Sequence, residues 1–223
     1  MASSYKYGRY TKADTMRYGP GHKDEARIKI LNAAGRGFRR LGFGGIGVDG
    51  LAKDAGVTSG AFYGHFPSKA EAFKAAAVAG LVQLREAIED LRAKDAEGWL
   101  PTFVDFYMSV RRTCDLAESC ALQSLTPEVA RADHGTKTAY EAELVKVAEA
   151  VAKGLPNGPL AIRRRTAWAI LALLSGGVSM ARSAADPKTG AQIAAGIKAA
   201  ITTLTGNAAA TAPPAGTPAH TEQ

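Results

Sequence analysis

VDGLAKDAGVTSGAFYGHFPSK, residues 48–69, is the stretch of this sequence that decides its fold. Its first eight residues carry apolar side chains at the spacing of one face of a helix, namely Val48, Leu51, Ala52 and Ala55. Gly56 follows directly, and glycine enters the left-handed conformation that ends many helices without a steric penalty. The pattern predicts a short amphipathic helix that ends in a glycine turn.

A second short helix is expected directly after this turn. Thr58 can cap it, because a threonine hydroxyl accepts a hydrogen bond from the otherwise unpaired amides of the first turn. Phe62 and Phe66 are four residues apart and give this helix a buried face, and Pro67 ends it. Two short helices, a glycine turn and a polar outer surface define a helix-turn-helix motif.

Residues 30–69 resemble the DNA-binding signature of the tetracycline-repressor (TetR) family of transcriptional regulators. In the turn region the matching residues are Leu51, Ala52, Ala55, Gly56, Val57, Thr58, Gly60, Tyr63, His65, Phe66, Ser68 and Lys69. Upstream they are Ile30, Leu31, Ala33, Ala34, Phe38, Gly42 and Phe43. Gly47 departs from the family, which usually has a serine or threonine cap at this position. The resemblance implies a DNA-binding regulator and not an enzyme.

The resemblance also implies an all-α fold. An N-terminal three-helix helix-turn-helix domain is joined by a long helix to a C-terminal helical domain for ligand binding and dimerisation. We therefore divide the chain into a flexible basic arm (1–22), the DNA-binding domain (23–70), the effector and dimerisation domain (71–205) and a disordered tail (206–223). The arm has four tyrosines and four Lys/Arg residues. It either contacts a minor groove or the DNA backbone, or is a terminus without a function.

Helical patterning without an alternating strand signal continues through the rest of the chain. Ser68 caps a long helix, whose apolar stripe runs from Phe73 to Leu91. Further helices are expected at residues 99–113, 116–124, 127–152, 160–185 and 188–204. The breaks are marked by Pro127, Pro156, Pro159 and Pro187. Within 127–152, residues 133–135 form a further candidate break.

The basic residues are concentrated in the N-terminal third of the chain. The formal net charge is +7. Residues 1–75 hold 13 Lys/Arg and 6 Asp/Glu, whereas residues 76–223 hold 15 of each. All of the net positive charge therefore lies in the part that contains the helix-turn-helix. Such a distribution is typical of a polyanion-binding head on a neutral body.

Composition narrows the class of protein further. A chain of 223 residues that is 46% hydrophobic can bury a substantial core, and two cysteines do not make a disulfide framework. Because there is no secretory leader and no apolar run of membrane length, we expect a cytoplasmic protein without a membrane contact. Few histidines, no phosphate-binding glycine loop and no metal-ligand cluster argue against an enzyme, a metal site or a cofactor.

DNA contacts are assigned to the second helix of the motif and its surroundings. By resemblance, Tyr63 and His65 would donate hydrogen bonds to phosphates, and Lys69 would add a positive charge. The start of this recognition helix enters the major groove, and its side chains are short, at Thr58, Ser59, Gly60 and Ala61. The hydroxyls of Thr58 and Ser59 are thereby available to contact base edges. Since such a surface discriminates bases modestly, we expect a homodimer on a palindromic operator in double-stranded DNA.

The helices expected at 160–185 and 188–204 resemble the pair through which the family dimerises. The apolar stripe assigned to the dimer interface comprises Ile170, Leu174, Val178 and Ala181. Small residues in this stripe suit close packing of helices. The alternative is that the stripe belongs to the core of a single chain.

The body is expected to bind an unknown small-molecule effector. A pocket between helices needs apolar walls and a few polar anchors, and the candidates are Phe103, Tyr107, Cys120, Tyr140 and Trp168. The alternative is that these are plain core residues. An effector would favour a conformation in which the two recognition helices no longer match the half-sites. A repressor is therefore the preferred interpretation.

Two other interpretations stay open. The resemblance implies that Cys114 or Cys120 could sense electrophiles or oxidants, as a cysteine in this region does in some members of the family. Cys120 lies at the expected start of an apolar helix, where amides favour a thiolate; a buried, inert cysteine is the opposing interpretation. In a different class, the chain would be a helical interaction protein that does not bind DNA. The presence of Tyr63, His65 and Lys69 on a basic head argues against that class.

Overall fold

Helices form almost all of the chain that can be described. The computed structural model describes residues 20–156 and 158–206, and no β-strand occurs among them. The all-α fold expected from the sequence is confirmed. Residues 1–19 of the expected arm and 207–223 of the expected tail lie outside the described residues. Among the helices of the described part, none combines the length and hydropathy that crossing a bilayer requires.

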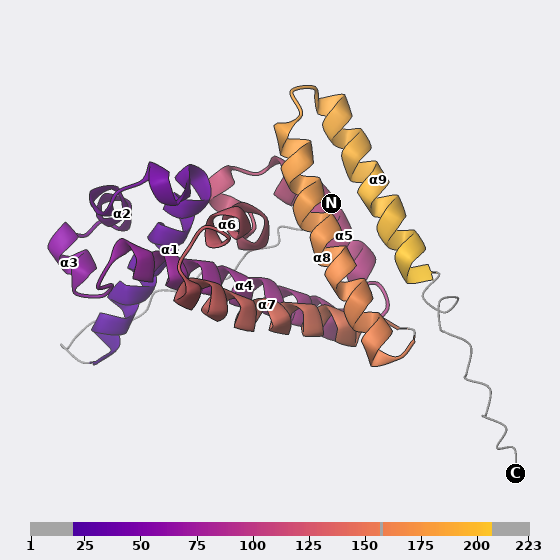
Figure 1. Cartoon of the computed structure of the whole chain (residues 1–223), viewed down its shortest axis with the longest axis horizontal. Helices are drawn as coiled ribbons and strands as arrows, with labels where there is room; N and C mark the ends of the chain where they lie inside the picture. Colours follow the sequence, from indigo (N-terminus) through magenta and orange to yellow (C-terminus); the bar gives the residue numbers. More distant parts are fainter. Residues whose placement is uncertain (1–19, 157, 207–223) are drawn as a thin grey trace, which may run out of the picture.

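Three helices form the N-terminal domain, which we call the head (Figure 1). They are α1 (Pro20–Gly45), α2 (Val48–Ala55) and α3 (Ser59–Tyr63). Their apolar faces meet in one core, whose most deeply buried members are Ile30, Ala34, Phe38, Leu51, Phe62 and Phe66. Near its end α1 bends at Gly42, where a φ of 73° lies in the left-handed region that favours glycine.

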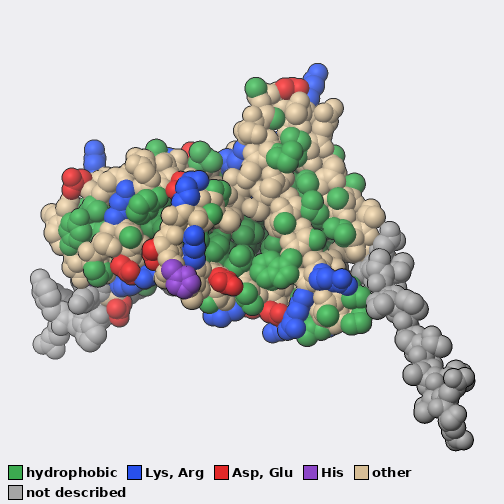
Figure 2. Space-filling model, in the orientation of Figure 1, with side chains coloured by type: hydrophobic (Ala, Val, Ile, Leu, Met, Phe, Trp, Pro, Cys, Tyr) green, Lys and Arg blue, Asp and Glu red, His purple; other side chains and the backbone are tan. Residues whose placement is uncertain are grey.

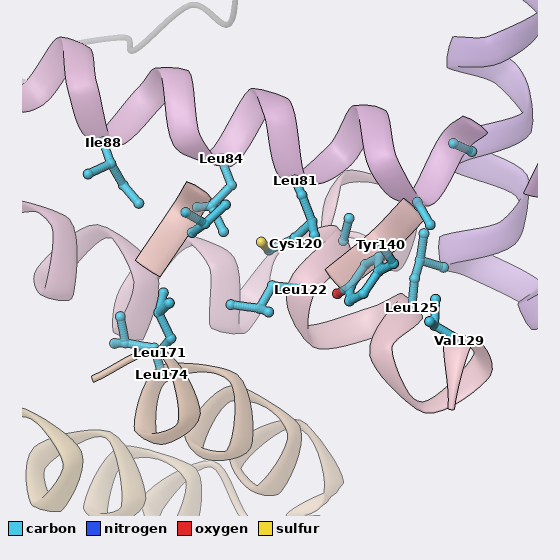
Figure 3. Close-up of a cluster of buried hydrophobic side chains, with 14 of the residues drawn as sticks. Leu81, Leu84, Ile88, Cys120, Leu122, Leu125, Val129, Tyr140, Leu171 and Leu174 are labelled. Carbon is cyan, nitrogen blue, oxygen red and sulfur yellow. The ribbon is translucent and has the colours of Figure 1, made fainter. Parts of the chain in front are cut away.

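One helix, α4 (Lys69–Lys94), belongs to the head and to the rest of the chain. Near its start Phe73 meets Phe38 of α1 edge to face, with the ring centroids 5.3 Å apart. Further along, its buried side chains face α6 and α7 (Figure 3), and they include Leu81, Leu84 and Ile88. A continuous helix therefore crosses the domain boundary that the sequence suggested near residue 70.

The C-terminal domain, which we call the body, is a bundle that α4 completes. Its other elements are α5 (Trp99–Thr113), the 3-10 helix η1 (Leu116–Glu118), α6 (Ala121–Val129), α7 (His134–Gly154), α8 (Leu160–Ser183) and α9 (Pro187–Gly206). Figure 1 shows α4 and α7 side by side, with α8 and α9 as a neighbouring pair at the end away from the head. The short helix α6 lies between the head and α8.

A buried carboxylate joins α4 to α7. Glu143 is 5% exposed, and its two oxygens accept hydrogen bonds from Arg85 Nε at 2.7 Å and Lys146 Nζ at 3.0 Å. Burial works to raise the pKa of Glu143, but the hydrogen bonds from Arg85 and Lys146 outweigh it and lower the pKa. The carboxylate is thus charged and fully paired inside the body.

The helix boundaries near residue 127 differ from the sequence expectation. Pro127 lies inside α6, which begins at Ala121, and the break comes at residues 130–133. Pro127 removes one backbone hydrogen bond from α6, and the helix ends two residues later, at Val129. Asp133 then caps α7, because its Oδ1 accepts from the N–H of Thr136 at 2.9 Å. The helix expected at 116–124 is likewise replaced by η1 and the start of α6.

Gly80 allows α4 and α6 to approach closely. A methyl group at Gly80 would lie 2.3 Å from Cβ of Ala121, which is far inside van der Waals contact. We expect Gly80→Ala to lower the free energy of unfolding by about 1–3 kcal/mol, as overpacking a core does. The better helix propensity of alanine offsets part of this loss. Urea denaturation followed by circular dichroism measures the change.

Ala121→Gly supplies the control, because it removes the atom that the new methyl group would meet. The Gly80→Ala, Ala121→Gly double variant should be more stable than the sum of the two single changes predicts, by about 1–2 kcal/mol. Strictly additive effects would mean that the close approach of α4 and α6 is not the cause.

Candidate nucleic-acid interface

The turn between α2 and α3 has the geometry that the sequence predicts. Gly56 adopts a left-handed conformation with φ 66° and ψ 37°. Its N–H donates to the carbonyl of Lys53 at 2.9 Å, and the N–H of Val57 donates to the carbonyl of Ala52 at 2.9 Å. The last carbonyls of α2 are therefore paired, which fixes the direction in which α3 leaves the turn.

Side-chain caps hold the ends of the next two helices. Oγ1 of Thr58 accepts from the N–H of Ala61 at 3.1 Å, and Oγ of Ser68 accepts from the N–H of Glu71 at 3.1 Å. Both caps are predicted by the sequence and are found. Gly47 begins α2 without a side-chain cap. The recognition helix is thus fixed at its start although it has few residues.

The recognition helix α3 has one buried and one exposed face. Phe62 is fully buried, whereas Tyr63 is 53% exposed. His65, just after α3, is half-buried; its Nδ1 is buried and has no hydrogen-bond partner in the described part of the chain. Only Nε2 is then left to contact an external group. Lys69 begins α4 with Nζ 4.4 Å from the centre of the Phe43 ring, a distance typical of a cation–π contact.

The hydroxyl groups expected to face base edges are already engaged within the protein. Thr58 uses its oxygen as the cap of α3. Oγ of Ser59 donates to Oδ1 of Asp49 in α2 at 2.5 Å. Gly60 and Ala61 are exposed beside them. Contact of these residues with DNA stays a prediction, but Ser59 cannot donate to a base while its proton is given to Asp49.

Cations of the head also make internal contacts. Nε of Arg39 donates to the carbonyl of Ala117 in η1 at 2.7 Å, and burial lowers the pKa of this guanidinium. Arg40 forms an ion pair with Asp54 at 3.4 Å. Arg39 therefore links the head to the body, a role that its position in an arginine-rich helix end does not reveal.

Four of the five candidate effector residues are brought together inside the body. They come from α5, the start of α6 and α7, and all are buried: Phe103, Tyr107, Cys120 and Tyr140. Figure 3 shows Cys120 and Tyr140 among apolar side chains beside α4. The rings of Phe103 and Tyr107 lie 5.5 Å apart. Whether they bind a ligand stays a prediction, since here they pack as core residues.

Two phenol groups in this cluster are buried and neutral. The hydroxyl of Tyr107 has no hydrogen-bond partner among the described residues. The hydroxyl of Tyr140 lies 2.7 Å from Oγ1 of Thr126. Burial raises the pKa of Tyr107 well above its usual range and raises the pKa of Tyr140 to about 12. Both groups are therefore protonated at physiological pH.

Trp168 does not belong to this cluster. It is 42% exposed on α8, so the expectation that it lines the same pocket is corrected. The inward face of this turn of α8 is taken by Ala167, Ile170 and Leu171, which are buried. Since successive residues of a helix point about 100° apart, Trp168 is turned toward the outside.

The stripe assigned to the dimer interface lies in the interior of the single chain. Ile170 and Leu174 are 0% exposed, Val178 is 1% exposed and Ala181 is 6% exposed. Side chains that are buried within one chain have no surface left for a second chain, so the structure corrects this assignment. The stripe packs α8 against its neighbours α5, α6, α7 and α9. These four residues belong to the core of the single chain, which is the alternative that the sequence left open.

Both cysteines are free thiols, and one of them touches a guanidinium group. Cys120 is buried, whereas Cys114 is half-buried with Sγ 3.2 Å from Nη2 of Arg182. The same nitrogen donates to the carbonyl of Arg111 at 2.7 Å. Cysteine-based sensing stays a prediction. Within residues 20–156 and 158–206, no group of three or more His, Cys, Asp or Glu side chains is arranged to hold a metal ion.

Comparison with known proteins agrees with this geometry. Residues 30–76 match the sequence model described as bacterial regulatory proteins, tetR family, whereas no curated protein sequence matches the chain. Among solved structures, NemR of Escherichia coli in its reduced form is similar with a TM-score of 0.68 at 17% identity, over 81% of this chain and 97% of that one.

Two further solved structures share the fold. FadR from Bacillus subtilis in complex with stearoyl-CoA has a TM-score of 0.59 at 16% identity, over 80% of this chain and 97% of that one. A TetR-family regulator from Streptomyces coelicolor has a TM-score of 0.60 at 19% identity, over 83% and 98% of the two chains. Residues 30–76 of the chain therefore match the TetR family, and the chain has the fold of TetR-family transcriptional regulators, as the sequence predicts.

Proposed function

We propose that this protein is a ligand-responsive repressor, which binds a palindromic operator as a homodimer and is released by a small-molecule effector. The observation that carries the proposal is the recognition helix α3, capped by Thr58, anchored by the buried Phe62 and followed by a capped α4. It lies within the segment that matches the TetR family. Acting on bacterial DNA places the protein in the cytoplasm.

Phosphate contacts position the head on DNA. The exposed phenol of Tyr63 and Nε2 of His65 are donors next to α3, and Lys69 adds a charge. Residues 1–23 hold five Lys/Arg against one Asp, so the arm and the first residues of α1 supply more than half of the net charge of +7. Such contacts provide affinity without base specificity.

The dimer interface is the outer face of α8 and α9, opposite the stripe that packs inward. On α8 the exposed residues follow at the spacing of one helix face, at Trp168, Ala172, Gly176 and Ser179. On α9 the exposed residues include Ala195, Gly196 and Ala199. Figure 2 shows that the visible surface of this helix pair, away from its ends, is mostly hydrophobic or uncharged. A partner copy would cover this surface and place two heads on one operator.

The effector is an uncharged, largely apolar molecule. The candidate cluster offers neutral anchors, Tyr107 and Tyr140, and the nearby carboxylate of Glu143 is fully paired. A charged ligand group would be desolvated there without a counter-charge, which is unfavourable. Figure 2 shows hydrophobic side chains in a recess between α6, α7 and α8. FadR, which shares the fold, is in complex with stearoyl-CoA, which supports a ligand role for the body.

Arg39 connects the effector region to the head. Its partner carbonyl, that of Ala117, lies in η1, between α5 and α6. On the same side, a methyl group at Gly42 would lie 2.9 Å from Oε1 of Glu128 in α6. A ligand that separates α5 from α6 would therefore displace the surface on which α1 rests. The ligand shifts the protein between the arrangement with α5 and α6 together and the one with them apart, because it binds the second more tightly.

Removing one phosphate donor tests the DNA-binding role. Selection of genomic fragments by the purified protein should enrich a short palindrome, which then serves as the probe. We expect Tyr63→Phe to weaken dimer binding of this probe about a hundredfold, because each of the two subunits loses one hydrogen bond to a charged group, an effect of about tenfold per subunit. Fluorescence anisotropy at fixed salt measures it, and circular dichroism checks that the variant is folded. Equal affinity of Tyr63→Phe and the original protein would remove Tyr63 from the interface.

A charge on the outer face of α8 tests the dimer interface. A side chain at Gly176 meets no atom within 4 Å of its Cβ position, so Gly176→Arg should leave the folded chain intact. We expect it to convert the dimer to a monomer and to weaken operator binding at least about tenfold, because one half-site is lost. Sedimentation velocity measures the mass. Ala142→Arg, at an exposed position of α7, should stay dimeric; a dimeric Gly176→Arg protein would contradict this interface.

A matched pair of probes tests the effector chemistry. We expect neutral benzophenone to bind the body and benzoylbenzoate, its carboxylate analogue, to bind far more weakly. Tyr107→Phe should weaken benzophenone binding about fivefold, since a neutral hydrogen bond contributes about 1 kcal/mol. Isothermal titration calorimetry gives both affinities, and circular dichroism checks that the variant is folded. Tighter binding of the carboxylate would rule out an uncharged site.

A further inference from the structure

The end of α3 that would enter the major groove carries a carboxylate. Asp49, near the start of α2, is exposed and accepts the hydroxyl proton of Ser59, the first residue of α3, at 2.5 Å. In helix-turn-helix proteins the first residues of the recognition helix lie against base edges. If α3 binds DNA as proposed above, Asp49 is therefore carried to the base edges together with Ser59.

The Asp49–Ser59 pair can accept hydrogen bonds but cannot donate them. A serine hydroxyl has a single proton, and Ser59 gives that proton to Asp49. An ionised carboxylate has no proton to give. What the pair presents to DNA is the remaining carboxylate lone pairs and the lone pairs of the serine oxygen. Its partner on DNA must be a donor.

Long donors are few in the segment that carries the pair. In residues 46–66, the sequence contains one Lys or Arg, Lys53 near the end of α2. Small residues lie close to the pair in sequence, at Gly47, Gly50, Gly60 and Ala61. Guanine is usually read by an Arg or Lys that donates to O6 and N7, and no such side chain begins α3. The surface is therefore biased toward bases that donate.

The major groove offers two base donors, N4 of cytosine and N6 of adenine. Adenine presents its amino group beside the acceptor N7, which repels a carboxylate, whereas cytosine has no acceptor next to N4 on the same base. Thymine O4 and guanine O6 and N7 are acceptors and would be repelled. We propose that the Asp49–Ser59 pair is a specificity determinant that selects a cytosine in each half of the operator.

A purely structural role for Asp49 makes a different prediction. An acidic residue in the first turn of a helix interacts favourably with the helix dipole, and its bond to Ser59 also ties α2 to α3. If this were its whole role, replacing Asp49 would change stability and weaken all DNA sequences alike. A base-reading role instead changes which base is preferred at one symmetric position.

Selection from a random double-stranded library by the full-length protein separates the two roles. We expect the original protein to enrich cytosine at one position of each half-site by about tenfold over the other bases. Asp49→Asn keeps an oxygen that accepts from Ser59 but adds an amide donor, and Asn pairs with adenine N6 and N7. The enriched base at that position should then change from cytosine to adenine. Ser59→Ala should still select cytosine, because the carboxylate remains.

Asp54→Asn is the matched control. Asp54 is in the same helix and pairs with Arg40 at 3.4 Å, so its replacement removes the same charge without altering the pair. The control should bind all sequences somewhat more tightly and keep the cytosine preference. If Asp49→Asn keeps the original preference while DNA is still bound, the readout proposal is overturned and the DNA-binding function stands. If the original protein retains no DNA in the selection, both the readout proposal and the DNA-binding function are overturned.

Discussion

The structure depends on burying one helix, α4, in two cores. Near its start Phe73 packs on Phe38 and Phe43 of the head, and farther along Leu81, Leu84 and Ile88 lie in the body. Burying each of these large side chains contributes about 1.5–3 kcal/mol to stability. Separating the helix from either core is therefore unfavourable. Gly80 sets the distance to α6. Any change in how the body packs must therefore be transmitted along a rigid helix to the head, and Arg39 offers a second connection through η1.

Electrostatics on the head divide into two parts with different consequences. Some cations serve the fold, since the half-buried Arg39 donates to the carbonyl of Ala117 and Arg40 pairs with Asp54. Much of the net positive charge instead belongs to residues 1–23. At the same time the start of α3 carries the acceptors of the Asp49–Ser59 pair. In the proposed complex, affinity would come from phosphate contacts, which carry no sequence information, while base preference would come from a few short polar groups. Two subunits would then be needed for a specific site.

Local features follow from the sequence, whereas the choice between two faces of a helix does not. The turn at Gly56 and the caps at Thr58 and Ser68 are confirmed, because each involves residues within five positions of one another. Pro127 predicts a break, yet α6 contains it near its end. On α8 both faces are largely apolar, so periodicity could not tell which one packs inward. Trp168 and the stripe beginning at Ile170 were consequently assigned to the wrong surfaces.

The sequence by itself determined the all-α class, the helix-turn-helix and its family, and the concentration of basic charge in the N-terminal third. Helix spacing, turn geometry and capping are properties of short segments, which a linear reading contains. The tertiary structure alone decided that Ser59 gives its proton to Asp49, ten positions away, and that Arg39 is held by a carbonyl 78 positions away. It also decided which face of α8 is buried within the chain. Such contacts depend on how complete helices pack, because burial selects one neighbour for each face among many that the sequence would allow.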